Sequence, residues 1–235
     1  MTTKLTINAY FQAMRDVLRD NGKPEYAQKQ IAYMKNHFDF YGLNAPLWLR
    51  LSKDFFETHG VFDGEDLKTF VRLCFDEPQR EGHYIALEMT QRQLKKQPED
   101  FIYFLEELIL TKSWWDSVDW LAKLVAGHFT RFPHQIAPIT EGWIMAENIW
   151  LQRMAITFQR YFKQKTDEKR LFDYIRRTAH SNEFFIQKGA GWALREYAKI
   201  NPTAVIAFCN THKLAALTRR EALRHLNDVQ ATSVA

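Results

Sequence analysis

Apolar residues recur at helical spacing along nearly the whole chain, and this pattern limits the fold more than any other feature. In residues 5–20, for example, Tyr10, Met14 and Val17 fall three or four residues apart, which places them on one face of a helix. No stretch alternates with period two for long enough to build a sheet. The spacing predicts helices over about residues 5–20, 24–38, 47–58, 65–75, 80–96, 99–110, 114–130, 134–145, 147–163, 167–180, 183–199, 202–211 and 218–226.

Turn signals separate these helices at short intervals. The chain contains Asn21-Gly22, Gln97-Pro98, Phe132-Pro133 and Asn201-Pro202 at the expected breaks. Gly and Pro mark such breaks because Gly is conformationally free and Pro lacks the backbone N–H that a helix needs. Brief connections between many short helices favour stacked helical hairpins. The sequence therefore predicts an all-α protein.

An internal repeat supports this prediction. The segment Trp150–Ala155 resembles Phe185–Ala190 at an offset of 35 residues, and both read aromatic, aliphatic, Gln, basic, any residue, Ala. One step earlier, an aromatic residue again falls at Trp115. Self-similarity at this period is typical of an α-solenoid, in which each helical pair buries its apolar face on its neighbours. The concave face of such a solenoid suits an extended partner.

Size and composition indicate a globular chain of the reducing cytosol. The 235 residues are 46% hydrophobic, which is enough for a substantial core. Cys74 and Cys209 have no CxxC partner, as expected of a reducing compartment rather than a disulfide framework. No secretory segment and no membrane span is predicted. We therefore expect a cytoplasmic protein.

Positive charge gathers in the C-terminal part. Residues 1–140 contain 17 basic and 19 acidic side chains, whereas residues 141–235 contain 15 basic and 9 acidic ones. A basic region suggests a polyanionic partner. The alternative is that these Lys and Arg side chains only solvate outer helix faces.

Three tryptophans and two aspartates fall within seven residues in the middle of the chain. Trp115 and Asp119 are four residues apart, so on a helix they share one side, one turn apart. An indole face beside a carboxylate could hold a cation. The alternative is that the tryptophans belong to the core and that the aspartates are solvated or capping. The segment is Lys112-Ser113-Trp114-Trp115-Asp116-Ser117-Val118-Asp119-Trp120.

Two further features lie in the repeated helices. Arg153 and Lys188 occupy equivalent repeat positions, so they should project in the same direction as a ladder of cations for a phosphate backbone. A ladder that is merely solvated is the alternative. Gly189 and Gly191 each cost a helix about 1 kcal/mol relative to Ala, which suggests the close approach of another helix or of a ligand.

Several kinds of site lack sequence support. The eight histidines show no metal-ligand spacing such as HExxH, and there is no CxxC, glycine-rich phosphate loop or GxSxG elbow. Metal, nucleotide-dependent and covalent Ser or Cys chemistry are therefore not indicated. We expect no cofactor, no nucleotide and no metal.

Six segments follow one another in order along the chain: Tyr33–Phe38, Phe104–Ile109, Lys112–Asp119, Asn148–Arg153, Glu183–Lys188 and Gly191–Tyr197. Together they resemble the helical-repeat DNA alkylation repair glycosylases of the AlkD type, and the resemblance covers roughly residues 5–226. Two departures are visible: Asp39 stands where an apolar residue is more usual, and Gly189-Ala190 stands where bulkier residues are common.

The resemblance implies a single domain over residues 1–235, a right-handed α-solenoid of about six HEAT-like helical-hairpin repeats whose basic concave face wraps duplex DNA. Residues of about 227–235 are expected to form a disordered tail. The family excises positively charged alkylated purines, chiefly 7-methylguanine and 3-methyladenine, by hydrolysis of the N-glycosidic bond, and is thought to do so without flipping the base. It also implies a monomer with no membrane partner, located in the bacterial cytoplasm and associated with the nucleoid when it is bound to DNA.

Carried over residue by residue, the resemblance assigns catalysis to Asp119, Trp115 and Trp192. It assigns DNA binding to Tyr33, Lys35, Arg153, Lys188 and Arg195. No lysine is an obvious Schiff-base nucleophile, so a monofunctional enzyme is expected.

These residue types suit the chemistry. A base alkylated on a ring nitrogen is cationic and leaves readily, so the enzyme needs only to stabilise an oxocarbenium-like sugar and to orient a water. A carboxylate at Asp119 can do both, and indole faces at Trp115 and Trp192 can hold the cationic nucleotide. Two alternatives remain: a non-catalytic helical-repeat scaffold for nucleic acid or protein, and an RNA-directed relative.

Overall fold

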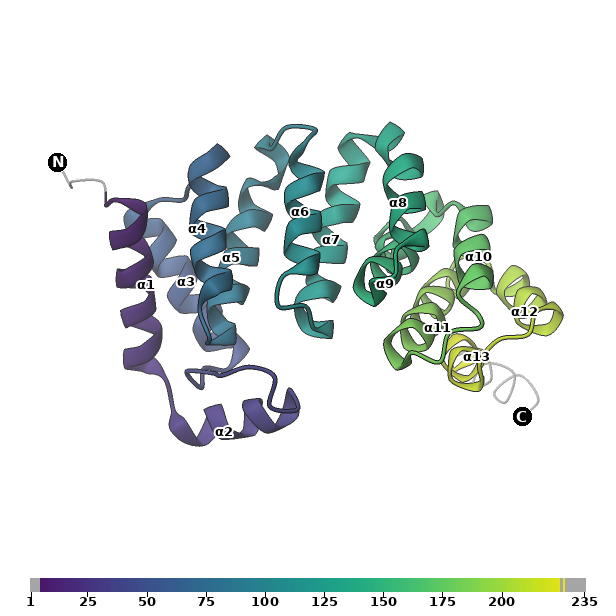
Figure 1. Cartoon of the computed structure of the whole chain (residues 1–235), viewed down its shortest axis with the longest axis horizontal. Coiled ribbons are helices and arrows are strands. Elements are labelled where there is room, and N and C mark those ends of the chain that lie inside the picture. Colours follow the sequence, from purple (N-terminus) through teal and green to yellow (C-terminus); the bar gives the residue numbers. More distant parts are fainter. Residues whose placement is uncertain (1–4, 225, 227–235) are drawn as a thin grey trace. The chain divides into compact units, whose positions relative to one another are not determined.

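The computed structural model describes residues 5–224 and 226, and Figure 1 shows its helices. Short 3₁₀ turns η1 (Leu94–Lys96), η2 (Pro133–Gln135), η3 (Phe158–Tyr161) and η4 (Lys163–Lys165) lie between some of the α-helices. The α-helices are α1 (Ile7–Asn21), α2 (Pro24–Tyr33), α3 (Ala45–His59), α4 (Gly64–Asp76), α5 (Arg80–Gln93), α6 (Phe101–Leu110), α7 (Trp115–Arg131), α8 (Ile136–Met145), α9 (Ile149–Thr157), α10 (Glu168–Arg177), α11 (Phe184–Ala198), α12 (Pro202–Thr211) and α13 (Ala216–Leu223).

The all-α prediction is confirmed. Each of the thirteen predicted segments overlaps one of these α-helices, and the described residues contain no strand, only an isolated bridge between Asp39 and Gln79. The second helix is shorter than predicted because the chain leaves it after Tyr33. Lys35 and Asn36 then adopt φ values of 58° and 60°, a left-handed conformation that ends a helix.

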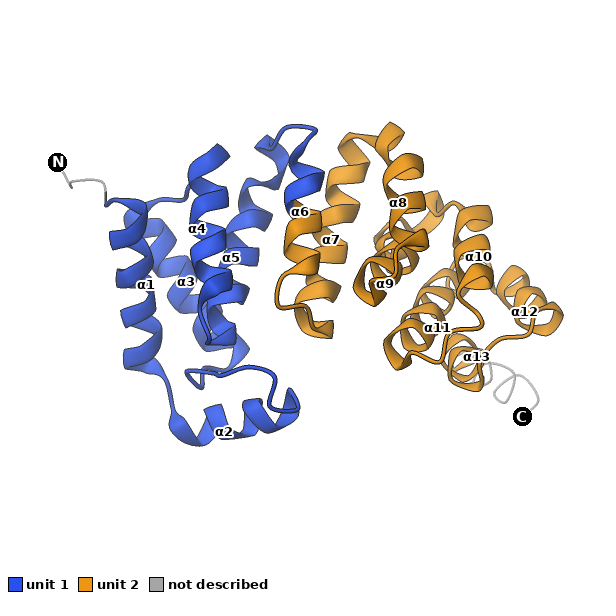
Figure 2. Ribbon diagram, viewed as in Figure 1, with its two compact units in different colours: residues 1–104 blue, residues 105–235 orange. Residues whose placement is uncertain are grey.

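The chain forms two compact units, residues 1–104 and 105–235 (Figure 2). The boundary falls within α6. That the chain is one domain stays a prediction. The expected disordered tail at residues 227–235 lies outside the described residues.

In unit 1, helices α1, α3, α4 and α5 pack around a core that includes Leu67, Phe70 and Ile85, all 0% exposed. A buried carboxylate orders the loop after α2. Glu81 Oε1 accepts hydrogen bonds from the backbone N–H groups of Gly42 and Leu43 at 2.9 and 3.1 Å. These bonds satisfy loop amides that burial would otherwise leave without a partner.

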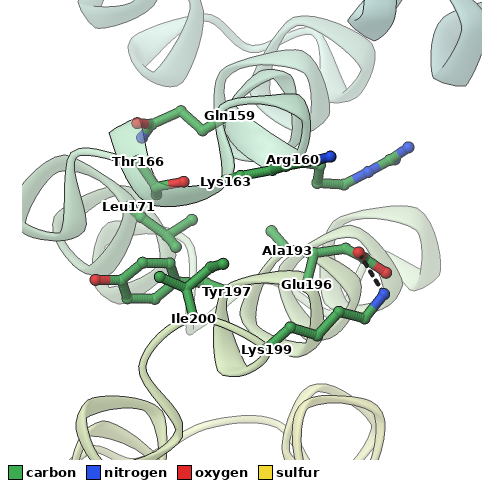
Figure 3. A pocket seen from close by; sticks show the side chains of 10 residues that line it. All are labelled: Gln159, Arg160, Lys163, Thr166, Leu171, Ala193, Glu196, Tyr197, Lys199 and Ile200. Atoms are coloured by element: carbon green, nitrogen blue, oxygen red, sulfur yellow. Dashed lines mark hydrogen bonds and ion pairs between the residues drawn. The ribbon is translucent and has the colours of Figure 1, made fainter.

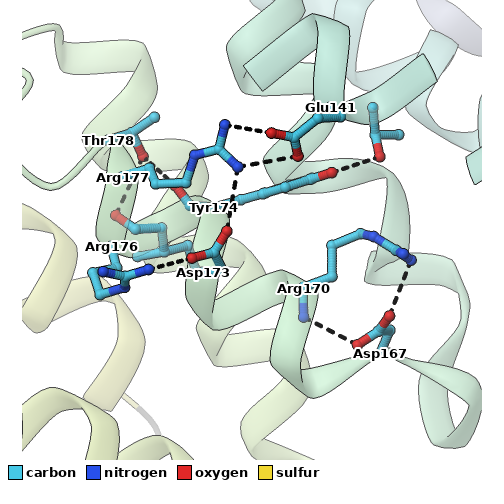
Figure 4. A network of polar contacts seen from close by, with 10 residues as sticks. Glu141, Asp167, Arg170, Asp173, Tyr174, Arg176, Arg177 and Thr178 are labelled. Carbon is cyan, nitrogen blue, oxygen red and sulfur yellow. Dashed lines mark hydrogen bonds and ion pairs between the residues drawn. The ribbon is translucent and has the colours of Figure 1, made fainter. Parts of the chain in front are cut away.

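In unit 2, helices α7 to α13 pack around a second core that includes Leu121, Phe129 and Leu194, all 0% exposed. Ion pairs on its surface link α8 to α10. Arg177 donates to both carboxylate oxygens of Glu141, at 3.0 and 2.7 Å, and also to Asp173 (Figure 4). Such a forked contact fixes the guanidinium more firmly than a single ion pair does.

The 35-residue repeat has a clear structural meaning. Its two glutamines make equivalent hydrogen bonds. Gln152 donates to the carbonyl of Ala146 and Gln187 donates to that of Ser181, each six residues earlier in the chain. The two final alanines, Ala155 and Ala190, are buried. The repeat therefore specifies how α9 and α11 each begin after the preceding loop.

Both cysteines are free thiols inside the protein. Cys74 lies in α4 and Cys209 in α12, and burial raises the pKa of each thiol, that of Cys74 strongly. Within the residues that the structure describes, no helix combines the length and apolar character that a bilayer crossing requires.

Candidate functional site

The candidate site begins at the first turns of α7. Trp114 occupies the cap position with extended backbone, and Trp115 is the first helical residue. Asp119 follows one turn later, so Trp115 and Asp119 share a side of the helix, as predicted. The Asp119 side chain is 17% exposed. The carboxylate is thus largely covered by protein yet still reaches solvent.

Arg153 of α9 holds the Asp119 carboxylate in a forked contact. Its Nη2 donates to Oδ1 and Oδ2 at 2.8 and 3.0 Å, and its Nε donates to Oδ1 at 3.1 Å. A planar guanidinium against a carboxylate fixes both distance and orientation. Arg153 itself is 2% exposed, so this is a partly buried ion pair with defined geometry.

An aromatic cluster holds Arg153 from the other side. Arg153 Nη1 donates to the carbonyl of Phe185 at 2.6 Å. The Phe185 ring packs on Trp114 and Trp150 at centroid distances of 5.1 and 4.9 Å. The first turns of α7, α9 and α11 are therefore joined through aromatic rings, and Trp114 belongs to this cluster.

A second arginine connects Asp119 to Trp192. The guanidinium carbon of Arg160 lies 3.2 Å from the centroid of the Trp192 ring, and Arg160 Nη1 lies 4.0 Å from Asp119 Oδ1. The Arg160 side chain is 5% exposed. Arg160 belongs to η3, directly after α9, so one short turn brings its charge between the carboxylate of α7 and the indole of α11.

A cavity of about 190 Å³ borders Arg160 (Figure 3). On its other side a lysine and a glutamate form an ion pair, with Lys199 Nζ 2.7 Å from Glu196 Oε2. The residues lining it are Gln159, Arg160, Lys163, Thr166, Leu171, Ala193, Glu196, Tyr197, Lys199 and Ile200.

Opposing influences set the ionisation of Asp119. Burial raises the pKa of its carboxyl above the ordinary value and outweighs the two arginines, which lower it. The charge of Asp116 raises it slightly further. Burial also lowers the pKa of Arg160, although an arginine side chain remains charged at any physiological pH.

The two glycines of α11 permit close packing. A Cβ at Gly189 would lie 2.9 Å from Arg153 Nη1, and a Cβ at Gly191 would lie 2.5 Å from Cβ of Glu221. Close helix packing, one of the two interpretations of these glycines, is therefore what the structure shows. Gly189 leaves room for the arginine that holds Asp119.

Two predicted DNA-binding residues, Lys188 and Arg195, form ion pairs within unit 2. Glu221 is buried and accepts from Lys188 and Arg195, each at 2.6 Å. The pKa of Glu221 is lowered, chiefly by the hydrogen bond from Lys188. Lys188 remains 39% exposed and Arg195 17% exposed. Their contacts with DNA stay predictions.

Arg153 does not extend into solvent as a member of the predicted cation ladder would, and its DNA contact stays a prediction. Its guanidinium is buried and used within the protein, against Asp119 and Phe185. The reason is that Arg153 forms an ion pair with the carboxylate of Asp119, about one repeat earlier in the chain. Tyr33 and Lys35 lie in unit 1, at and just after the end of α2, and both are exposed, so their predicted DNA contacts are untested.

Sequence reasoning missed Arg160. Its partner Asp119 lies 41 residues away in the chain and its partner Trp192 lies 32 residues away. Residues separated by 41 or 32 positions are not neighbours on one helix, so helical periodicity does not relate them to Arg160. The 3₁₀ turn that orients the Arg160 side chain has no distinctive sequence pattern. A cation about one repeat from both residues was the only available indication.

The family model described as DNA alkylation repair enzyme matches residues 14–226. The chain belongs to this family. Members of the DNA alkylation repair enzyme family act on DNA in the repair of alkylation damage, which is the role that follows for this chain.

Solved structures agree. The chain is similar to a predicted DNA alkylation repair enzyme from Enterococcus faecalis, with 32% identity over 87% of this chain and 96% of that one, at a TM-score of 0.81. It shares the fold of AlkD2 from Streptococcus mutans, at 17% identity, 84% and 96% coverage and a TM-score of 0.58. The smu.31 protein of Streptococcus mutans UA159 has the same fold, with 19% identity over 75% of this chain and 96% of that one, at a TM-score of 0.57. Among proteins of curated function, none matches the chain.

Proposed function

We propose that this member of the DNA alkylation repair enzyme family is a monofunctional DNA glycosylase that hydrolyses the N-glycosidic bond of positively charged N-alkylated purines, such as 7-methylguanine and 3-methyladenine, in duplex DNA. The observation that carries the proposal is the partly exposed carboxylate of Asp119, which Arg153 fixes and which lies beside Arg160, the arginine that stacks on the Trp192 ring. A carboxylate in such a frame suits a reaction that develops positive charge on a sugar.

The contacts of Asp119 leave it able to bind a water. A carboxylate has about four lone-pair positions, and Arg153 uses two on Oδ1 and one on Oδ2. A position on Oδ2 therefore remains for the attacking water. Arg153 orients the carboxylate and partly offsets its charge, so Asp119 acts most strongly on atoms in direct contact with it.

The indoles supply the second part of the proposed chemistry. A cationic base is attracted to the face of a tryptophan by about 0.5–2 kcal/mol, and a neutral base is not attracted in this way. Trp192 and Trp115 thus favour lesions that carry charge before the reaction begins. Because such bases are good leaving groups, no general acid is needed.

The test is release of 7-methylguanine from methylated duplex DNA. Asp119→Asn keeps the size of the side chain but removes its charge, so we expect release to fall about 100-fold or more while duplex binding persists. Glu147→Gln, which removes an exposed carboxylate after α8, should keep full activity.

Two results would reject the assignment. Undiminished release by a folded Asp119→Asn protein would exclude the catalytic role of this carboxylate. Binding without any release by the wild-type protein would favour the non-catalytic scaffold. A covalent complex trapped with borohydride would contradict a monofunctional mechanism.

A further inference from the structure

Arg160 places a positive charge at the position where the positive charge of the proposed substrate should lie. Its guanidinium lies on the Trp192 face at 3.2 Å from the ring centroid, and its Nη1 lies 4.0 Å from Asp119. Under the proposed function, these are the two groups that should receive the positive charge of the nucleotide. A guanidinium and an alkylated purine are both flat cations, and a single ring face has room for one of them.

The charges around Asp119 also indicate that Arg160 occupies the place of the nucleotide's positive charge. Asp119 carries one negative charge, whereas Arg153 and Arg160 carry one positive charge each. With both arginines in place the cluster has a net positive charge, which opposes an oxocarbenium-like sugar. Arg153 is held by Asp119 and by the Phe185 carbonyl, so Arg160 is the cation that is easier to remove.

Arg160 is held less firmly than Arg153. Its Nη1 is buried and has no hydrogen-bond partner among the described residues, and its Nη2 makes one long contact of 3.3 Å with the Tyr161 hydroxyl. The cavity of about 190 Å³ lies along its side chain (Figure 3). The backbone beside it is fixed, because Gln159 exchanges hydrogen bonds with the backbone of Asp167. The side chain can therefore move while its anchor stays.

We infer that Arg160 is a specificity-determining residue that stands in for the lesion in the free protein, so that a nucleotide reaches Trp192 and Asp119 only by displacing it. This inference rests on the proposed function. Displacement costs the contacts of Arg160 with Trp192 and Asp119. Only a nucleotide that brings its own positive charge restores both, so an undamaged base leaves Arg160 in place.

The test compares binding of two duplexes that differ only in charge. One contains 2′-fluoro-7-methylguanosine, in which fluorine slows loss of the cationic base. The other contains 7-methyl-7-deazaguanosine, which has the same shape and no charge. Arg160→Gln should bind the cationic duplex about 2- to 30-fold more tightly than wild type, the equivalent of one cation–π contact, with the neutral duplex little changed.

Matched variants isolate the cause. Arg160→Lys retains the charge and should remain close to wild type in the ratio of the two affinities. Lys165→Gln removes an exposed charge from the neighbouring turn η4 and should leave that ratio unchanged.

The remaining outcomes each overturn the inference. Equal weakening of both duplexes by Arg160→Gln would make Arg160 an ordinary phosphate contact, and unchanged binding of both would make it a packing residue. These failures are distinct from failure of the proposed function. If the wild type releases 7-methylguanine but Arg160→Gln does not tighten cationic binding, only the inference on Arg160 is lost.

Discussion

Asp119 combines partial burial with two cationic neighbours, and its ionisation should therefore be visible in the pH dependence of base release. The carboxylate must be charged to act. Burial raises the pKa of Asp119 above the ordinary value despite the arginines. Activity is then complete well above that pKa and is lost as the pH falls through it.

We predict that the acidic limb of the pH–rate profile lies above about 3.9, the ordinary value for Asp. Asp116→Asn should move this limb to lower pH, because the charge of Asp116 contributes to the raised pKa. The measurement is single-turnover release of 7-methylguanine across the acidic range. A limb at or below the ordinary value would show that Arg153 and Arg160 dominate over burial.

The sequence was informative about Asp119 and Trp192 through their motifs, but it did not reveal their surroundings. Arg153 was assigned to a phosphate contact because it aligned with Lys188 in the repeat. The structure shows that both cations face a carboxylate, Asp119 for Arg153 and Glu221 for Lys188. A basic and an acidic residue about one repeat apart would have been the better indication.

At the scale of elements, polar contacts between residues about one repeat apart connect the helices of unit 2. Arg153 pairs with Asp119 over 34 residues, Arg177 with Glu141 over 36, and the Trp143 indole donates to Glu106 over 37. Successive helical pairs thus use the same offset for their contacts. The helices themselves followed from apolar spacing, whereas these connections depend on how the helices cross.

The glycines of α11 give a prediction about two such crossings. At Gly191 an added Cβ would lie 2.5 Å from Glu221 Cβ and 2.8 Å from the Thr218 carbonyl oxygen of α13. Backbone cannot easily yield, so Gly191→Ala should lower the free energy of unfolding by about 1–3 kcal/mol. This loss should exceed the gain of about 1 kcal/mol in helix propensity.

Gly189→Ala should behave differently. Its Cβ would meet Arg153 Nη1 at 2.9 Å, the end of a side chain that can shift by a few tenths of an ångström. We expect little change in stability but a fall in base release of up to about tenfold, since misplacing a catalytic group by ~1 Å can cost about 100-fold. Urea unfolding and release assays on both variants check this pair. Equal loss of stability in the two would contradict it.

At the scale of the whole molecule, positive charge is concentrated between residues 141 and 235, where 15 basic side chains face 9 acidic ones. Much of that charge is internally balanced, as the ion pairs of Arg153, Arg177, Lys188 and Arg195 show. Charge composition alone therefore overstates the surface available for DNA.

Binding of undamaged duplex should nonetheless depend on salt. We predict a linear fall of log affinity with log salt concentration between about 50 and 200 mM NaCl, and Lys188→Gln should reduce the slope by about 0.9, the value for one phosphate contact. Lys53→Gln, on an exposed part of α3, serves as the matched variant. Fluorescence anisotropy gives the affinities. An unchanged slope for Lys188→Gln would remove this residue from the DNA contacts.

The burial of both thiols has a practical consequence for measuring motion. Cys74 and Cys209 are enclosed within α4 and α12, and the raised pKa of each keeps it protonated and unreactive. Cysteines introduced at the exposed positions of Lys53 in unit 1 and Lys165 in unit 2 would therefore react selectively with maleimide dyes. Energy transfer between the dyes would then report whether the two units change their separation when a duplex is added.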